Sequence, residues 1–365
     1  MRKHWIDNLR WVTVLLVLLY HVVYFYNNKG VFGGIGGFGE GKQYQDVVMY
    51  ILYPWFMTLL FLLAGISARY ALEKHTSKEW FRSRTRKLLV PGTIGLFVFH
   101  WMVGYFNTLV ASRQGLLEGM SPIAKYFMWA ISGTGPLWFI QVLWLLSLVL
   151  LLIRSLDKKD RLWNWCGKAG IIPAILFVVL LWAGEKTMIP NPKTDGIDGL
   201  LNLYKPVYYL IPFLLGYFVF SHEEVQEKVK KVWIPLMACA IVSGCILIVT
   251  TFGQDNTSAQ YLGNPLTCIY CWLMCLGMMG WFNAKFDRTG VFAGYMTRSS
   301  FGIYIVHYLV VASIGSMLKL HSQLPPWSMY LILAAAVFTL SPLLYEVLRR
   351  IPIIRWAVFG IRKKQ

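Results

Sequence analysis

Charged residues are scarce in this chain, and acidic residues are the scarcest of them. Only 14% of its 365 residues are charged, and 35 Lys and Arg stand against 17 Asp and Glu. About 25% of the residues in a soluble globular domain are charged, and such a domain is also less apolar than the 57% hydrophobic share found here. The composition therefore excludes an ordinary soluble domain and predicts a polytopic membrane protein.

Cysteines and cleavage signals are also sparse. The six Cys include one Cys-x-x-Cys, Cys268 to Cys271, which lies in an apolar run without a neighbouring His or a second pair. No metal site and no permanently bound cofactor is therefore expected. The basic amino terminus resembles the start of a signal peptide, but small residues at a cleavage site are missing, and Asp7 and Arg10 interrupt the apolar run. An uncleaved first helix is predicted.

Ten apolar stretches are long enough to cross a bilayer, which takes roughly 17 to 25 residues each. They are expected at about 10–27, 46–72, 88–111, 136–154, 170–184, 205–221, 233–252, 262–282, 299–318 and 327–349. The fifth and sixth are short or interrupted by proline. The prediction is an all-α protein with about ten transmembrane helices, forming a single integral-membrane domain over residues 1–365.

The basic residues predict the orientation in the membrane. Most Lys and Arg fall in alternate connecting segments, which the positive-inside rule places in the cytoplasm together with both termini. This spread over several short segments differs from the single dense basic face of a nucleic-acid-binding module. We therefore expect a lipid bilayer and no nucleic acid as partner.

The first predicted helix carries three ionisable groups along one stripe. At about 100° per residue, the step from Arg10 to His21 returns to nearly the same face, and Asp7 lies close to that face. Ionisable groups inside a membrane are costly and usually face a protein interior or a wet cavity. This stripe is the first candidate for chemistry.

Two further histidines, His100 and His307, fall inside predicted spans at a depth similar to that of His21, roughly 13–20 Å from the cytoplasmic edge. Ser300, Tyr304 and His307 follow i, i+4, i+7 spacing and form one polar stripe. Such a stripe suits either a wall that orients a substrate or hydrogen bonds between helices. The role of His100 stays open, and simple packing is the favoured reading.

A basic cytoplasmic segment precedes the third span. Its residues Arg84, Arg86 and Lys87 suit the phosphates of an anionic cytosolic molecule, because a guanidinium offers two donors to one phosphate. Trp138, at the outer start of the fourth span, is typical of an aromatic belt. The glycine-rich segment 30–41 lacks the Gly-Lys-Ser/Thr ending of a phosphate loop, so a flexible lid or linker is favoured, with its role left open.

Together these pieces resemble the membrane-bound acyltransferase 3 family of bacterial O-acyltransferases. Five blocks carry the resemblance, in order: Asp7-x-x-Arg10 with His21 after ten residues, Phe61-x-x-x-Gly65, the basic segment Arg84 to Lys87 before Pro91, Leu137-Trp138-Phe139, and Ser300-Phe-Gly-Ile-Tyr304-x-x-His307. Two positions depart from the pattern: Lys87 replaces the second Arg of Arg-x-x-Arg, and Pro136 replaces a His. The first block and Trp138 resemble the branch that succinylates periplasmic glucans.

The resemblance implies a multi-pass enzyme of the bacterial cytoplasmic membrane. It would transfer an acyl group, acetyl or succinyl-like, from acyl-CoA as co-substrate to a hydroxyl of an extracytoplasmic acceptor, a carbohydrate. His21 is expected to act as general base, with Asp7 supporting Arg10. Arg10, Arg84, Arg86 and Lys87 would bind the donor, and Ser300, Tyr304, His307 and Trp138 would orient the acceptor or donate to the oxyanion.

The alternative that stays open is a proton-coupled transporter or exporter of a small molecule or glycan precursor, with the buried histidines as proton relay. Inverted repeats and matching pairs of broken helices, which many transporters carry, are not visible. The acyl group, the acceptor and the oligomeric state also stay open at this point.

Overall fold

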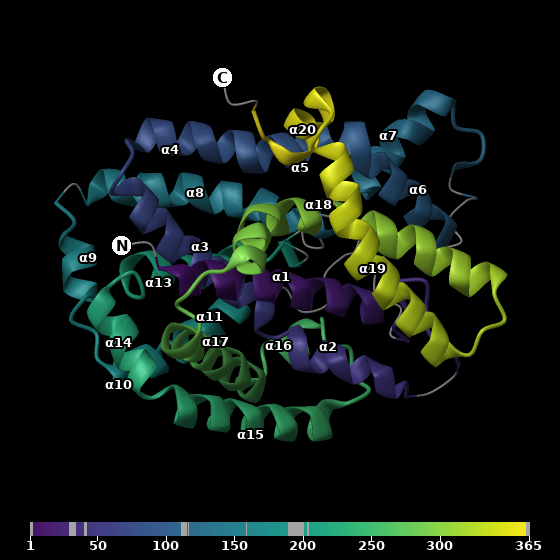
Figure 1. Ribbon diagram of the computed structural model, residues 1–365. Helices are drawn as coiled ribbons and strands as arrows, with labels where there is room; N and C mark the ends of the chain where they lie inside the picture. Colours follow the sequence, from purple (N-terminus) through teal and green to yellow (C-terminus); the bar gives the residue numbers. More distant parts are fainter. Residues whose placement is uncertain are drawn as a thin grey trace. The chain divides into compact units, whose positions relative to one another are not determined.

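The computed structural model describes residues 3–28, 34–39, 42–110, 115, 117–157, 159–188, 201–202 and 204–362. Helices account for nearly all regular structure in these ranges, and none of the residues described there forms a strand (Figure 1). This confirms the all-α prediction.

The first half of the chain contains α1 (His4–Phe25), η1 (Tyr44–Asp46), α2 (Val47–Leu52), α3 (Phe56–Leu72), α4 (Ser77–Arg84), η2 (Thr85–Leu89), α5 (Val90–Gly95), η3 (Leu96–His100), α6 (Trp101–Val110), α7 (Pro122–Ser132), η5 (Gly135–Leu137) and α8 (Trp138–Leu156). The second half contains α9 (Arg161–Cys166), α10 (Ile171–Leu176), α11 (Val178–Glu185), α13 (Pro206–Phe218), α14 (Glu223–Lys231), α15 (Trp233–Thr251), α16 (Ala259–Leu262), α17 (Pro265–Lys285), α18 (Val291–His321), α19 (Pro326–Leu348) and α20 (Pro352–Phe359). Segments η2 and η3 are π-helical.

Eight helices among the described residues are long and apolar enough to span a membrane. They are His4–Phe25, Tyr44–Leu72, Ser77–Leu109, Gly135–Leu156, Trp233–Thr251, Pro265–Lys285, Val291–His321 and Pro326–Leu348. The expected fifth and sixth spans are shorter apolar helices, Ile171–Glu185 and Pro206–Phe218. The chain is a multi-pass membrane protein, while the count of ten and the cytoplasmic termini stay predictions.

Proline explains where the expected second span differs from a single helix. Residues 46–72 form α2 and α3, separated at Pro54, because proline has no N–H and its ring disfavours helical backbone before it. The indole Nε1 of Trp55 donates to the Ile51 carbonyl at 2.7 Å, which supplies a partner to a carbonyl at the break. Helices α7, α9, α14 and α20 were not predicted, because they are short and lie in connecting segments. Helix α4 was not predicted either, because its polar residues precede the expected third span, which the structure extends back to Ser77.

The chain forms two compact units, each made of three segments. Unit 1 comprises Met1–Thr13, Tyr50–Phe81 and Leu145–Thr297, and unit 2 comprises Val14–Met49, Arg82–Trp144 and Arg298–Gln365. The single domain over residues 1–365 therefore stays a prediction, and each unit is described by itself.

In unit 1, α3 crosses α13 with the two backbones in direct contact. A Cβ on Gly65 would lie 2.0 Å from the Phe213 carbonyl, and a Cβ on Gly216 would lie 2.1 Å from the Leu62 carbonyl. Small residues allow this kind of close approach between membrane helices. Gly65, which belongs to one of the five motif blocks, is therefore required for packing.

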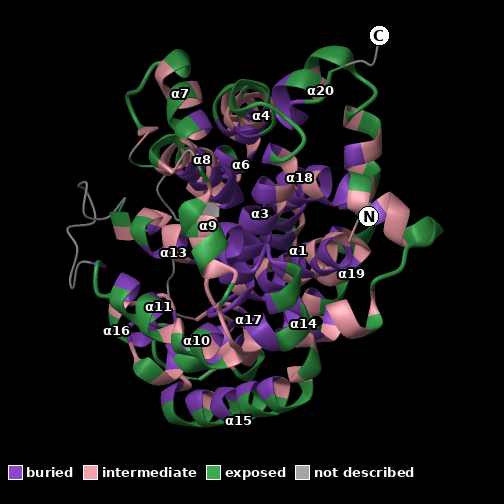
Figure 2. Cartoon of the chain, turned by 90° about the vertical axis from the view of Figure 1, so that its left-hand side faces the viewer, coloured by how far each residue is buried: buried purple, intermediate pink, exposed green. Residues whose placement is uncertain are grey.

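Within unit 1, a central helix is buried and a peripheral helix exposes apolar side chains (Figure 2). Almost all residues of α3 are buried, whereas α15, which packs against α17, exposes apolar side chains. These include Ile234, Ile241, Val242, Ile246 and Val249. An exposed apolar helix face suits contact with lipid tails.

In unit 2, the carboxyl-terminal helix α20 packs against α5 just beyond the basic segment. Gly360 ends α20 with a positive φ of 62°, and a Cβ there would lie 2.2 Å from the Arg86 carbonyl. Only glycine combines this backbone conformation with so close a contact. The end of α20 is thus held against η2.

Candidate active site

Two histidines that are distant in the sequence form a hydrogen-bonded pair in unit 2. His21, on α1, and His307, on α18, are 286 residues apart, and Nδ1 of His21 lies 3.1 Å from Nε2 of His307. The two ring centroids are 5.0 Å apart. His307 is completely buried, whereas His21 is partly exposed. The structure therefore brings together two of the predicted site residues.

The hydrogen-bond network determines which nitrogen of each imidazole carries the proton. Nδ1 of His21 lies 2.9 Å from the Val17 carbonyl, and Nδ1 of His307 lies 2.6 Å from the Tyr304 carbonyl. A carbonyl oxygen only accepts, so both Nδ1 atoms carry hydrogen. Nε2 of His307 then has a lone pair and accepts from Nδ1–H of His21.

This assignment leaves the lone pair of His21 on Nε2. Among the residues that the structure describes, none forms a hydrogen bond to this nitrogen. The rings of Tyr308 and Tyr24 contact the imidazole edge-on, with ring centroids 5.0 and 6.0 Å away. His21 is thus a neutral, oriented imidazole with an available lone pair, which is the arrangement that a general base needs.

The Leu-Trp-Phe block meets the Tyr304 stripe. The Tyr304 hydroxyl donates to the carbonyl of Pro136, and the rings of Tyr304 and Phe139 lie edge to face, 5.9 Å apart. Trp138 begins α8 and contacts the ring of Phe139. The Tyr304 hydroxyl thus donates within the protein, and its expected contact with the acceptor or the oxyanion stays a prediction.

Ser300 is buried on α18, one turn before Tyr304. Its place on the same helix as His307 agrees with the i, i+4, i+7 spacing. The stripe of α18 thus combines Ser300 with the carbonyl and hydroxyl of Tyr304 and with the imidazole of His307.

The predicted donor-binding residues lie around a widened helical turn. Arg84 ends α4, and Arg86 and Lys87 belong to the π-helical segment η2. Trp144 Nε1 donates to the Thr85 hydroxyl at 3.1 Å, which attaches α8 to this turn. Over the described ranges, neither Arg86 nor Lys87 forms an ion pair with a carboxylate, so both cations are available to an anion.

Asp7 and Arg10 lie on the part of α1 that belongs to unit 1. The Arg10 guanidinium donates to the Asp7 carboxylate at 3.1 Å and to the Ser67 hydroxyl at 2.6 Å. Ser67 in turn donates to the Leu63 carbonyl. The sequence did not single out Ser67, although its position two residues after Gly65, at the end of a motif block, was the available signal.

Unit 1 also contains a stack of side chains that was not predicted from the sequence. Trp163 lies between the guanidinium of Arg69, 3.9 Å from the ring centroid, and the imidazole of His222, 3.8 Å between centroids. Burial lowers the pKa of His222 below its ordinary value, against the opposing effect of its hydrogen bond to the Trp163 carbonyl. In the same region Lys3 lowers the pKa of the Glu223 carboxyl by hydrogen bonding to it. Only the tertiary structure brings these residues together.

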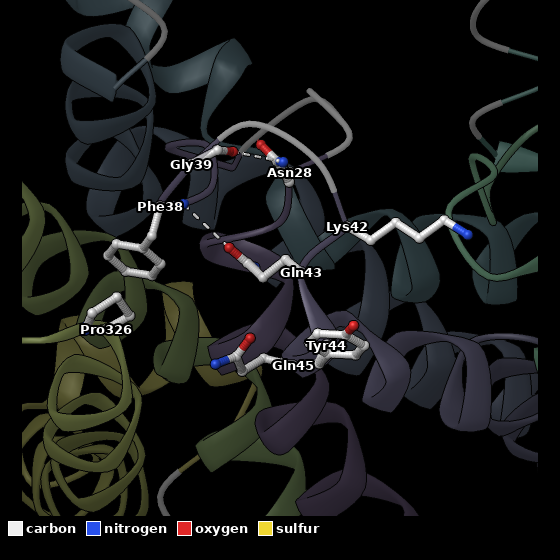
Figure 3. Close-up of a pocket in the computed structure, with 8 residues that line it drawn as sticks. All are labelled: Asn28, Phe38, Gly39, Lys42, Gln43, Tyr44, Gln45 and Pro326. Carbon is white, nitrogen blue, oxygen red and sulfur yellow. Dashed lines mark hydrogen bonds between the residues drawn. The ribbon is translucent and has the colours of Figure 1, made fainter.

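Each of the two units contains an open cavity among its described residues. One, of about 640 Å³, lies in unit 1 beside Trp163 and His222. The other, of about 200 Å³, lies in unit 2 and is lined by polar and aromatic side chains, including Asn28, Phe38 and Gln43 (Figure 3). Neither cavity is lined by His21 or His307.

The smaller cavity includes part of the glycine-rich segment. Asn28 Nδ2 donates to the Gly39 carbonyl at 2.9 Å, and Gln43 Oε1 accepts from the Phe38 N–H at 3.2 Å (Figure 3). Residues 30–33, 40 and 41 of this segment lie outside the described residues. Its interpretation as a lid or linker stays a prediction.

No metal site is found in the described part of the chain. There, no three side chains of the His, Cys, Asp or Glu type lie together in a way that could hold a metal ion. Cys268 and Cys271 are both buried in α17 with reduced thiols.

Long apolar helices, a basic helical turn and a hydrogen-bonded histidine pair with one available lone pair define a multi-pass membrane protein with the groups for acid–base catalysis. A comparison with protein families supplies the reaction class. The family described as "Acyltransferase domain" matches residues 3–346, which is nearly the whole chain. The chain therefore belongs to the membrane-bound acyltransferase 3 family. No curated protein and no solved structure matches it significantly.

Proposed function

We propose that this protein transfers an acetyl or succinyl-like group from cytosolic acyl-CoA to a hydroxyl group of an extracytoplasmic carbohydrate. Membership of the acyltransferase family supports acyl transfer in general. The observation that carries the chemistry is the available Nε2 lone pair of His21, since His307 and Val17 hold the opposite side of its ring.

In the proposed reaction, Nε2 of His21 removes the proton of the acceptor hydroxyl while the oxygen attacks the thioester carbonyl carbon. The tetrahedral intermediate collapses, the C–S bond breaks, and the departing coenzyme A thiolate takes the proton from the His21 imidazolium. An ester forms, and the neutral base is restored. No covalent acyl-enzyme is required.

His307 has a positioning role in this proposal. When His21 gains a proton, its Nδ1–H still points at two acceptors, Nε2 of His307 and the Val17 carbonyl. Both stabilise the imidazolium, as the third residue of a catalytic triad does. Tyr304 fixes the tautomer of His307 through its carbonyl, so the stripe of α18 orients the base.

The donor is proposed to bind through its phosphates to Arg84, Arg86 and Lys87. Three neighbouring cations form an electrostatic site for a polyanion, and a guanidinium can bind one phosphate with two donors. Within unit 1, Asp7 and Ser67 hold Arg10 in place, and its predicted contact with the donor is a prediction separate from that for these three cations. The pantetheine arm of coenzyme A is long enough to bring a thioester from such a site into the membrane.

The acceptor is proposed to enter from the extracytoplasmic side, past Trp138, and to reach the stripe of α18 that begins at Ser300. A glucan is the first acceptor to examine, because the first motif block and Trp138 resemble the succinylating branch. The proposed location is the bacterial cytoplasmic membrane, with both termini in the cytoplasm.

The test uses purified full-length protein in lipid nanodiscs, incubated with radiolabelled acetyl-CoA or succinyl-CoA and an oligosaccharide. We expect acyl-CoA-dependent label in the oligosaccharide and stoichiometric release of coenzyme A. His21→Ala should abolish both, whereas the matched control His321→Ala, which changes an exposed histidine on α18, should not. Wild-type transfer by the His21 variant would end the proposed mechanism.

The transporter alternative is tested with the same protein in sealed vesicles. Proton-coupled accumulation of the oligosaccharide without any covalent change would favour transport. Label transfer without accumulation would favour the enzyme.

A further inference from the structure

His100 is a buried imidazole whose hydrogen-bonding groups are unused. Only 1% of the surface of His100 is exposed. Within the described part of the chain, neither ring nitrogen has a hydrogen-bond partner, although the backbone of Gly133 is near the ring. A neutral imidazole always carries one N–H. Burying such a donor without an acceptor is unfavourable, so the orphaned group calls for an explanation.

The backbone around His100 is also unusual. The residue ends η3, the second of two π-helical segments in the same span. Such wide turns are rare and occur frequently at functional sites, because they turn side chains away from the regular helical positions. His100 thus shares two features with functional residues: unsatisfied polarity and irregular helical backbone.

His100 belongs to the same unit as the histidine pair, and His307 lies within electrostatic range of it. The donors of the pair and its neighbours are already used. Nδ1–H of His21 points at Val17 and His307, Nδ1–H of His307 points at Tyr304, and the Tyr304 hydroxyl donates to Pro136. The N–H of His100 is an imidazole donor of the same unit that none of these hydrogen bonds uses.

This proposal rests on the proposed function. We infer that His100 donates its N–H to the thioester carbonyl oxygen as that oxygen becomes the oxyanion of the tetrahedral intermediate. The donor lies in a water-poor interior, where a hydrogen bond to developing negative charge is strong, and the bond would form fully only in the transition state.

A matched pair of substitutions tests the inference. Methionine and glutamine are similar in length, but only glutamine keeps an N–H donor. We expect His100→Met to lower kcat about 10²- to 10³-fold, the usual loss for one oxyanion donor, with KM for acyl-CoA unchanged. His100→Gln should recover most of this rate, and the pH dependence of kcat should keep its midpoint, because the base is intact.

Thermal unfolding separates this role from a structural one. Replacing an unpartnered buried polar group by an apolar one is neutral or stabilising, so His100→Met should unfold at the wild-type temperature or above while transfer is lost. Trp129→Phe is the control, because Trp129 Nε1 is a second buried N–H without a partner in the described chain, lying on α7 against Tyr105. It should leave kcat unchanged.

The outcomes are distinct. Wild-type kcat in His100→Met would overturn the inference while leaving the proposed function in place. Equal loss in the Met and Gln variants together with a lower unfolding temperature would also overturn it, since it would indicate packing. Loss in Trp129→Phe instead of His100→Met would place the donor on α7. Absence of acyl-CoA-dependent transfer in the wild-type protein would refute the proposed function itself.

Discussion

Replacing His307 by leucine tests whether this residue stabilises the protonated base. In the proposed reaction, Nδ1–H of His21 is shared between Nε2 of His307 at 3.1 Å and the Val17 carbonyl at 2.9 Å. Leucine removes the first acceptor and leaves the second. A hydrogen bond to a charged group is worth about 1.5–3 kcal/mol, which corresponds to a roughly 10- to 150-fold lower kcat. Because the carbonyl of Val17 remains, we expect the lower half of that range.

The assay is the initial rate of coenzyme A release in the presence of an oligosaccharide acceptor, measured over a range of acyl-CoA concentrations. KM for acyl-CoA should stay near the wild-type value, since the lost interaction forms with the imidazolium only. His321→Leu provides the control, because it makes the same chemical change at an exposed position of α18. A His307→Leu enzyme that keeps kcat within threefold of wild type, with normal thermal unfolding, would refute the assigned role.

Three further predictions concern packing, donor binding and pH. Gly65→Ala should lower the free energy of unfolding by ~1–3 kcal/mol or more, because the added Cβ would collide with the backbone of α13. The control Gly290→Ala should leave the free energy of unfolding unchanged, because no atom lies within 4 Å of the added Cβ. Thermal unfolding in detergent measures both variants. The double change Arg86→Gln and Lys87→Gln should raise KM for acyl-CoA about tenfold or more. Added salt should raise KM less in this variant than in wild type, because salt screens the lost charges. A salt dependence equal to that of wild type would argue against phosphate binding at Arg86 and Lys87. Burial lowers the pKa of His222, so the unfolded chain takes up a proton more readily than the folded one; stability should be full above about pH 6.5 and fall as the pH drops below it. As the pH drops through this range, the melting temperature of wild type should fall further than that of His222→Gln. Parallel curves would contradict the linkage.

The candidate site was only partly accessible from the sequence. His21 stands out because an imidazole inside an apolar run is costly, and Ser300, Tyr304 and His307 stand out by their spacing on one helix. The groups that these side chains contact could not be predicted from the sequence. The Pro136 carbonyl, the hydrogen bond of Arg10 to Ser67 and the unused donor of His100 depend on how separate helices pack, and no local pattern encodes them.

The hydrogen bond of Tyr304 illustrates why these partners require the structure. Its hydroxyl looked available for substrate when only α18 was considered. The contact with Pro136, at the start of another span, uses that hydroxyl inside the protein. A role that depends on a free donor can be assigned only when all neighbouring elements are known.

Composition and apolar runs were enough to predict a helical membrane protein, and the motif blocks indicated the acyltransferase family, which the family comparison confirms. The physical reason is that a bilayer requires every backbone group to be satisfied within its own segment, so span and composition are local properties. The tertiary structure alone decided the tautomers of His21 and His307, because these follow from a contact between residues 286 positions apart. It also decided why Gly65 must be glycine, since the carbonyl that excludes a side chain belongs to another helix.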